Sequence, residues 1–283
     1  MKIMLVRDRN VLNNNWLAYF ANLLHERGHE VVIACDTYGK LGVSAPGHEL
    51  EPGVRLANVN GKTSSPLQNF WRRIRCKALP SWHLFDRLIK AEKPDVIICY
   101  FPVDLYNVTR FQHHNIPIVQ MVHGYPPMIL DKVLHKNPLS RAFCRQSFAR
   151  INTWQVLMNS YKKEIDPFFA PQNVVRIANP VKQYAENEMA DLSAEKKRII
   201  YVARIEKKTK RPHLLVEAFA KIAAEFPDWK VEIWGMRKYP EYEKEINDFI
   251  RAHNLTGQVA LMGYTEDVEG LYRRADIHAF PSA

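Results

Sequence analysis

Two cations, Arg204 and Lys210, lie six residues apart around a basic turn that links two apolar segments. Residues 197–205 are rich in β-branched and aromatic side chains, which is typical of a buried strand. Residues 212–226 repeat apolar side chains at helical spacing. Pro212 fits a first helical turn, because the N–H that it lacks has no intrahelical partner there. The sequence therefore predicts a strand, a cationic turn and a helix that Lys210 opens.

Anion binding is the chemistry that this turn favours. The unpaired N–H groups and the positive dipole end of a helix attract anions. Arg204 can hold a phosphate with a planar fork, and Lys210 adds a compact positive charge. The alternative is a solvated charge cluster on a surface turn, and the turn alone does not decide between the two.

His123 is a second candidate, because it directly follows a predicted strand at residues 116–122. In open α/β sheets, ligands bind beyond the carboxyl ends of the strands, which is where His123 would lie. A purely structural histidine at a strand end is the alternative interpretation.

Aromatic and basic side chains interleave in residues 69–79, which include Trp71, Arg72, Arg73 and Arg75. One interpretation is a helix that lies on an anionic membrane surface. The other is an exposed helix or loop with a half-buried tryptophan. Nothing in the chain resembles a nucleic-acid-binding module, so we expect no nucleic-acid partner.

Charge is unevenly distributed along the 283 residues. Residues 1–181 hold 23 Lys and Arg against 13 Asp and Glu, which accounts for the whole net charge of +10, whereas residues 182–283 hold 17 of each. This asymmetry favours an anionic partner for the first half, such as an acidic lipid surface or an anionic saccharide. The four cysteines are scattered, as in a reduced, cytosolic protein.

Predicted strands and helices alternate along the chain, which indicates parallel sheets. The turn after the first strand, residues 8–15, has no glycine, which excludes a dinucleotide fingerprint. A charged segment at residues 182–196 is typical of a linker. We therefore predict an α/β protein with two Rossmann-like doubly wound domains, residues 1–181 and 182–283.

The order of these motifs resembles that of the family 4 glycosyltransferases, which have the two-domain GT-B fold. The likeness is strongest at residues 201–218, 231–235 and 263–282, where a strand, an arginine, a loop, a lysine and a helix are followed by two strands that end in glycine and by Ala-Asp-Ile-x-x-x-Pro-Ser. It is weaker at residues 94–96, 123–124, 160 and 179–180.

The resemblance implies transfer of a sugar from a nucleotide-diphosphate sugar to an acceptor hydroxyl, with retention at the anomeric carbon and with no cofactor or required metal. The donor would lie mostly on residues 182–283, facing a cleft between the domains. Arg204 and Lys210 would then hold the diphosphate. The resemblance assigns further donor contacts to Gly235, Met262, Gly263, Tyr264 and Ser282.

The first domain would bind the acceptor, a saccharide or a lipid-linked saccharide. His123 would orient the transferred sugar as the catalytic residue. Trp71, Arg72, Arg73 and Arg75 would form an acceptor or membrane face. Members of the family commonly act in bacterial envelope polysaccharide or lipopolysaccharide synthesis, so we expect a cytoplasmic enzyme at the inner face of the membrane.

Two departures from the family pattern shape these expectations. Asn13, Asn14 and Asn15 replace a glycine pair after the first strand. The family also continues past Pro-Ser into Glu-Gly-Phe-Gly and a second Glu seven residues after the first, and these two carboxylates bind the nucleotide ribose and the donor sugar. We therefore expect an incomplete second domain in a truncated chain with little or no activity. The alternatives are a sugar-nucleotide 2-epimerase of the same fold and a non-catalytic, membrane-associated module.

Overall fold

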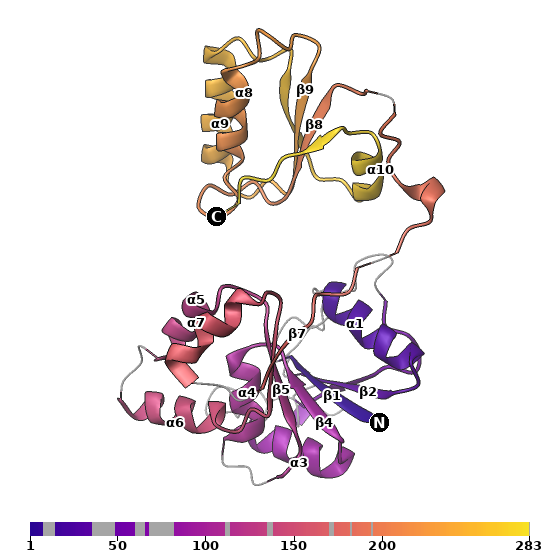
Figure 1. The fold of residues 1–283 in the computed structure, drawn as a ribbon, viewed down its shortest axis with the longest axis vertical. Helices are drawn as coiled ribbons and strands as arrows, with labels where there is room; N and C mark the ends of the chain where they lie inside the picture. Colours follow the sequence, from indigo (N-terminus) through magenta and orange to yellow (C-terminus); the bar gives the residue numbers. More distant parts are fainter. Residues whose placement is uncertain are drawn as a thin grey trace. The chain divides into compact units, whose positions relative to one another are not determined.

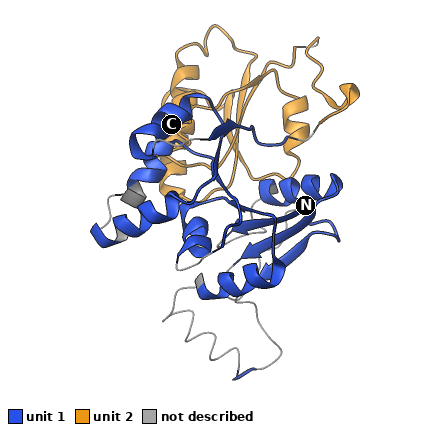
Figure 2. Ribbon diagram, turned by 60° about the horizontal axis from the view of Figure 1, so that its bottom comes forward, with its two compact units in different colours: residues 1–181 blue, residues 182–283 orange. Residues whose placement is uncertain are grey.

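The computed structural model describes residues 1–7, 15–35, 49–59, 66–67, 82–110, 114–134, 138–169, 173–181, 183–193 and 195–282. The chain divides into two compact units, Met1–Val181 (unit 1) and Lys182–Ala283 (unit 2), which Figure 2 colours separately. Each unit is a parallel sheet with helices packed on both faces (Figure 1).

Unit 1 is built on a seven-stranded parallel sheet with the strand order β3-β2-β1-β4-β5-β6-β7. The strands are β1 (Lys2–Arg7), β2 (Glu30–Cys35), β3 (Arg55–Asn58), β4 (Val96–Cys99), β5 (Ile118–Val122), β6 (Thr153–Val156) and β7 (Val174–Arg176). The helices are α1 (Asn15–Glu26), α3 (Trp82–Glu92), α4 (Pro102–Thr109), α5 (Pro126–Leu134), α6 (Pro138–Phe148) and α7 (Ser160–Phe169).

Strand β1 shows how one sheet supports two hydrophobic cores. Successive side chains of a strand point to opposite faces. Ile3 and Leu5 pack in the core that contains the α1 residue Leu17. Met4 and Val6 pack in the core built from α3, α4, α5, α6 and α7. A strand covered on both faces is apolar where it is buried, as this one is between Lys2 and Arg7.

Unit 2 has a four-stranded parallel sheet with the order β10-β9-β8-β11. Its strands are β8 (Arg198–Val202), β9 (Lys230–Trp234), β10 (Val259–Gly263) and β11 (Ile277–His278). Its helices are α8 (Pro212–Ala220), α9 (Pro240–Ala252) and α10 (Val268–Arg273), and a short 3₁₀ turn, η1, spans Glu186–Glu188. Helices α8 and α9 cover one face of the sheet, and α10 covers the other.

The strand order of each sheet reverses at one place, which we call its switch point. In unit 1 the switch point lies between β1 and β4, and in unit 2 it lies between β8 and β11. The loops that leave neighbouring strands diverge to opposite faces there and leave a crevice at the carboxyl edge. These two positions are therefore where the fold itself offers ligand sites.

In unit 2, the bounds of helix α8 differ from the sequence prediction at both of its ends. Helix α8 begins at Pro212, so Lys210 precedes it by two residues rather than opening it. It ends at Ala220 instead of near Phe226, because Ile222 N bonds to Phe219 O and the chain tightens into a three-residue repeat. Strand β11 covers only two residues, Ile277 and His278.

Candidate functional site

The loop between β8 and α8, residues 203–211, leaves the sheet at the unit 2 switch point. The Tyr201 hydroxyl lies 3.0 Å from the carbonyl oxygen of Arg204 and 3.4 Å from that of Lys210. The hydroxyl has a single hydrogen to donate, so the two carbonyl oxygens share this donor. The Tyr201 side chain is buried, and burial raises the pKa of its phenol well above the ordinary value, which keeps it a neutral donor. One phenol therefore holds both ends of the loop together.

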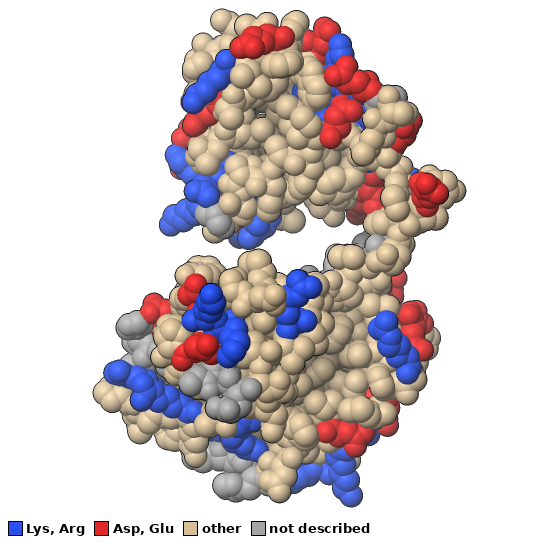
Figure 3. Space-filling view, in the orientation of Figure 1, with Lys and Arg blue, Asp and Glu red and all other residues tan. Residues whose placement is uncertain are grey.

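The cations of this loop have different partners. The Lys207 ammonium forms an ion pair with Glu245 at 2.6 Å. The exposed Arg204 guanidinium lies 3.4 Å from the Glu206 carboxylate. The Lys210 ammonium lies 4.7 Å from the centroid of the Phe280 ring, and the described residues include no carboxylate paired with it. Basic side chains gather at the end of unit 2 where the C-terminus lies (Figure 3).

The segment after β11 closes the other side of the switch point. Ser282 Oγ donates a hydrogen bond to the carbonyl oxygen of Thr209 at 2.9 Å. The Phe280 ring also lies 6.1 Å from the Tyr201 ring. The structure thus brings Ser282, which the sequence assigned to the donor site, onto the same loop as Lys210.

Gly235 ends β9 in close contact with the backbone of the neighbouring strand. A Cβ atom at this position would lie 1.7 Å from the carbonyl oxygen of Ala203, the residue before Arg204. Gly235 N donates to Gly263 O at 2.7 Å, and Gly263 has a φ of +95°. The absence of a side chain at Gly235 therefore lets three strand ends meet.

The remaining unit 2 candidates lie at the end of β10. Met262 and Tyr264 both have exposed side chains, on either side of Gly263. Together with Arg204, Lys210 and Ser282 they lie at the ends of adjacent strands of one sheet. The structure therefore places the seven predicted donor residues along a single sheet edge.

His123 follows β5 in unit 1 and is enclosed by aromatic rings. Its ring lies 4.5 Å from that of Trp16 and 4.6 Å from that of Tyr100. Burial lowers the pKa of the imidazole to about 4, so the ring is neutral at ordinary pH. The ring also interacts with the Gln155 side chain, which partly opposes this lowering of the pKa.

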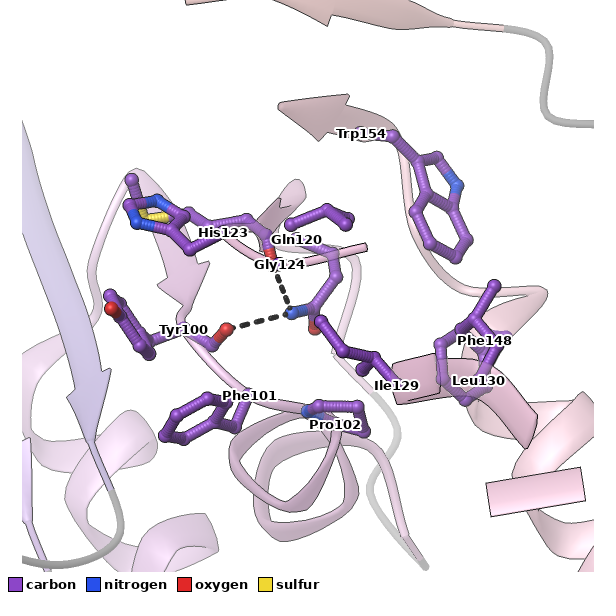
Figure 4. A pocket seen from close by; sticks show the side chains of 12 residues that line it. Tyr100, Phe101, Pro102, Gln120, His123, Gly124, Ile129, Leu130, Phe148 and Trp154 are labelled. Carbon is purple, nitrogen blue, oxygen red and sulfur yellow. Dashed lines mark hydrogen bonds between the residues drawn. The ribbon is translucent and has the colours of Figure 1, made fainter. Parts of the chain in front are cut away.

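A cavity of about 260 Å³ lies beside His123 (Figure 4). Its lining is mainly apolar and comes from β5 and β6, from the segments that follow β4 and β5, and from α4, α5 and α6. The residues are Tyr100, Phe101, Pro102, Gln120, Met121, Val122, His123, Gly124, Ile129, Leu130, Phe148 and Trp154. In Figure 4 the His123 ring lies on the Tyr100 side, whereas Trp154 and Phe148 lie on the opposite side.

Gln120 contributes a buried amide to the wall of this cavity, and it is only 2% exposed. Its Nε2 donates to the carbonyl oxygens of Tyr100 at 3.3 Å and Met121 at 2.9 Å, while Oε1 has no partner. Trp16, Tyr100 and Gln120 were not predicted as site residues. Tyr100 follows a strand just as His123 does, and Gln120 interrupts an apolar strand. Both residues could therefore have been found from the sequence.

Some predicted residues cannot be placed. Trp71, Arg72, Arg73 and Arg75, together with Asn13 and Asn14, lie outside the described residues. Within the described part of the chain, no group of three or more His, Cys, Asp and Glu side chains is arranged to hold a metal ion. The same part of the chain contains no helix that combines the length and the apolar character needed to cross a bilayer.

Comparison with known structures shows the same fold over nearly the whole chain. The crystal structure of TarM from S. aureus matches with a TM-score of 0.70 and 13% identity, over 99% of this chain and 80% of that one. A glycosyltransferase from Rickettsia africae matches with a TM-score of 0.67 and 17% identity, over 99% and 73%. Anabaena Alr3699/HepE, solved with UDP and glucose, matches with a TM-score of 0.65 and 15% identity, over 100% and 74%.

Family models match both units of the chain. The model "Glycosyltransferase Family 4" matches residues 14–182, and the model "Glycosyl transferases group 1" matches residues 185–283. A search of curated proteins found no significant match. The two sheets with flanking helices and the structural neighbours confirm the GT-B fold expected from the motifs. Since the first model spans more than half of the sequence, the chain belongs to glycosyltransferase family 4 and is an enzyme of the glycosyltransferase class.

Proposed function

We propose that this glycosyltransferase moves a sugar from a nucleotide-diphosphate sugar to a hydroxyl of a saccharide or lipid-linked acceptor, with retention at the anomeric carbon and without a metal. One observation carries the proposal: the phenol of Tyr201 holds Arg204 and Lys210 at the two ends of a loop at the unit 2 switch point. Cations fixed in this way can stabilise the charge that develops on a leaving diphosphate.

The pairing of Arg204 supports this assignment. Its carboxylate partner, Glu206, lies 3.4 Å away, and the arginine side chain is 64% exposed. Such exposed ion pairs contribute little free energy, so a diphosphate can replace the carboxylate at small cost. Lys210 rests on an aromatic ring and keeps its full charge for a ligand. We assign the nucleotide base to the exposed side chains around Gly263 and the orientation of the transferred sugar to the neutral imidazole of His123.

Nucleotide binding by the purified chain tests the donor site. We expect UDP, GDP or ADP to raise the melting temperature, with uridine, guanosine or adenosine as the respective uncharged comparison, because a ligand stabilises the state that it binds. Arg204→Ala and Lys210→Ala should each weaken binding of the diphosphate about tenfold, the scale of one charge-assisted hydrogen bond. Lys208→Ala, which removes an exposed cation from the same loop, is the matched control and should bind normally.

Several outcomes would contradict the proposal. Failure of all three nucleoside diphosphates to bind would remove the donor site. Epimerisation of UDP-N-acetylglucosamine without an acceptor would favour a 2-epimerase instead. Retention is tested separately, by the anomeric configuration of the product in proton NMR: an α-linked donor should give an α-linked product.

We propose a cytoplasmic location at the inner face of the membrane and a role in bacterial envelope polysaccharide or lipopolysaccharide synthesis. The net charge of +10 on residues 1–181 supports the membrane part, since anionic lipid attracts basic surfaces. Co-sedimentation with anionic and neutral vesicles at low salt tests it, because screening is weakest there. A chain that remains in the supernatant with anionic vesicles would contradict peripheral membrane contact.

A further inference from the structure

Five side chains form a cluster at the unit 1 switch point; we call it the Arg7 cluster, and its members are Arg7, Trp16, Tyr100, Phe101 and His123. They come from the ends of β1, β4 and β5 and from the first turn of α1. The centre of the Arg7 guanidinium lies 4.8 Å from the Tyr100 ring centroid and 4.2 Å from that of Phe101. Tyr100 in turn lies 5.5 Å from Trp16 and 4.6 Å from His123.

Two nitrogen atoms of this cluster that can only donate are buried and have no hydrogen-bond partner among the described residues: Arg7 Nε and Trp16 Nε1. Buried polar atoms in folded proteins are nearly always paired, because leaving one unpaired costs about 1–3 kcal/mol. Two such atoms beside the Tyr100 ring are therefore unusual. They point to a ligand that completes them.

The chemistry of these two nitrogens specifies that ligand. Arginine and indole N–H groups can only donate, so the ligand must supply acceptor oxygens. Arg7 forms no ion pair among the described residues, which favours an oxygen that carries negative charge. The Trp16 and Tyr100 rings add apolar faces, which suit the carbon skeleton of a sugar ring.

We propose that the Arg7 cluster binds an oxyanion carried by the acceptor saccharide, which is a carboxylate or a phosphate on the sugar. The inference rests on the proposed function and deepens it by assigning an anionic acceptor. The position supports it, because the cluster occupies the crevice that the fold leaves between β1 and β4.

Asp104 is the acidic residue placed beside this cluster, and its role is accounted for. Its carboxylate accepts a hydrogen bond from Phe101 N at 2.6 Å, at the start of α4. Its side chain is fully buried. The charge of Arg7 is therefore not neutralised by a neighbouring carboxylate in the described residues.

Binding of small sugars to the whole purified chain tests the proposal. The probes are methyl glucuronide, glucose 6-phosphate and the uncharged methyl glucoside, followed by tryptophan fluorescence and by the melting temperature. We expect a charged probe to bind at least tenfold more tightly than methyl glucoside. Arg7→Gln should remove this preference, and Trp16→Phe, which keeps an aromatic ring but loses the N–H, should weaken it. Arg27→Gln, at an exposed arginine of the same unit, should leave it unchanged.

The two charged probes distinguish the two sources of the oxyanion, since preference for one assigns a carboxylate and preference for the other a phosphate. Equal binding of charged and uncharged sugars would overturn the proposal. So would an Arg7→Gln chain that loses UDP affinity but keeps its sugar preference, because the cluster would then serve the donor. UDP binding measured in parallel separates this failure from failure of the proposed function. If Trp16→Phe does not fold, Arg7→Gln alone decides the outcome.

Discussion

The hydroxyl of Tyr201 lies 3.0 Å from the carbonyl oxygen of Arg204, so a residue inside the strand fixes the loop that leaves it. The side chain of Tyr201 is buried in the core against α8 and α9, and only its oxygen reaches the loop. The geometry of the cations is thus tied to core packing rather than to loop sequence.

We expect Tyr201→Phe to loosen the loop while the core keeps its ring. The change removes one shared hydrogen bond and should lower the free energy of unfolding by about 1 kcal/mol. It should also weaken binding of nucleoside diphosphates several-fold, because Arg204 and Lys210 lose their common anchor. Chemical denaturation and UDP titration measure the two effects. Unchanged UDP affinity would show that the phenol does not order the cations.

Gly235→Ala should disturb the donor site through the backbone. The new Cβ would lie 1.7 Å from Ala203 O, so two strand ends must separate. Overpacking of this kind costs about 1–3 kcal/mol, and the shift would displace Arg204. Gly257→Ala is the matched control, since a Cβ there has no atom within 4 Å. Thermal unfolding of both variants checks the difference, and equal melting temperatures would contradict it.

The contribution of Lys210 to nucleotide binding should depend on the Phe280 ring against which it packs. Its ammonium lies 4.7 Å from the Phe280 centroid, and such cation–π contacts contribute about 0.5–1 kcal/mol at exposed sites. Phe280→Leu keeps an apolar side chain and removes the π face, so UDP should bind about two- to fivefold more weakly. Tyr272→Leu, at another exposed aromatic residue of unit 2, is the control. A larger loss in the control would contradict this role for Phe280.

His123 should titrate far below an ordinary histidine. Burial lowers its pKa to about 4, so between pH 6.5 and 4 the unfolded chain binds the proton more readily than the folded chain. Stability should therefore be full above pH 6.5 and fall as the pH drops toward 4. Each pKa unit corresponds to 1.36 kcal/mol, and partial solvent access reduces the total loss to roughly 1–2 kcal/mol.

NMR titration of the histidine ring signals measures this pKa directly. The His123→Asn variant identifies the signal and should lose this component of the pH dependence of unfolding. A midpoint near pH 6.5 for His123 would contradict the burial that the structure gives it.

The fold was predictable because its signals are local and repeated. Apolar strands alternate with amphipathic helices, and Gly28, with a φ of +83°, follows the end of α1 in a conformation that favours glycine. The donor residues were predictable because each follows a strand or begins a loop within a recognisable motif. Both the fold and the donor residues could be predicted, because the residues that define them lie close together in the sequence at regular spacing.

The neighbours of His123 were not predicted, since their proximity depends on strand order. Trp16 and Tyr100 are 84 residues apart in the chain, yet their ring centroids lie 5.5 Å apart. This contact exists because β4 crosses over to pair with β1, and no local pattern encodes that pairing. The role of Tyr201 was missed for a different reason: a tyrosine in an apolar strand reads as core, and only coordinates reveal where its oxygen lies.

Both units place a positive group on an aromatic ring at the corresponding position of their sheets. Arg7 lies over Phe101 in unit 1, and Lys210 lies over Phe280 in unit 2. A carboxylate in either place would cancel the cation that it holds, whereas a ring immobilises the cation and leaves its field intact. Each unit thereby holds a cation in a fixed position that no carboxylate of the described residues neutralises. A negatively charged substrate can bind this cation without displacing an acidic side chain.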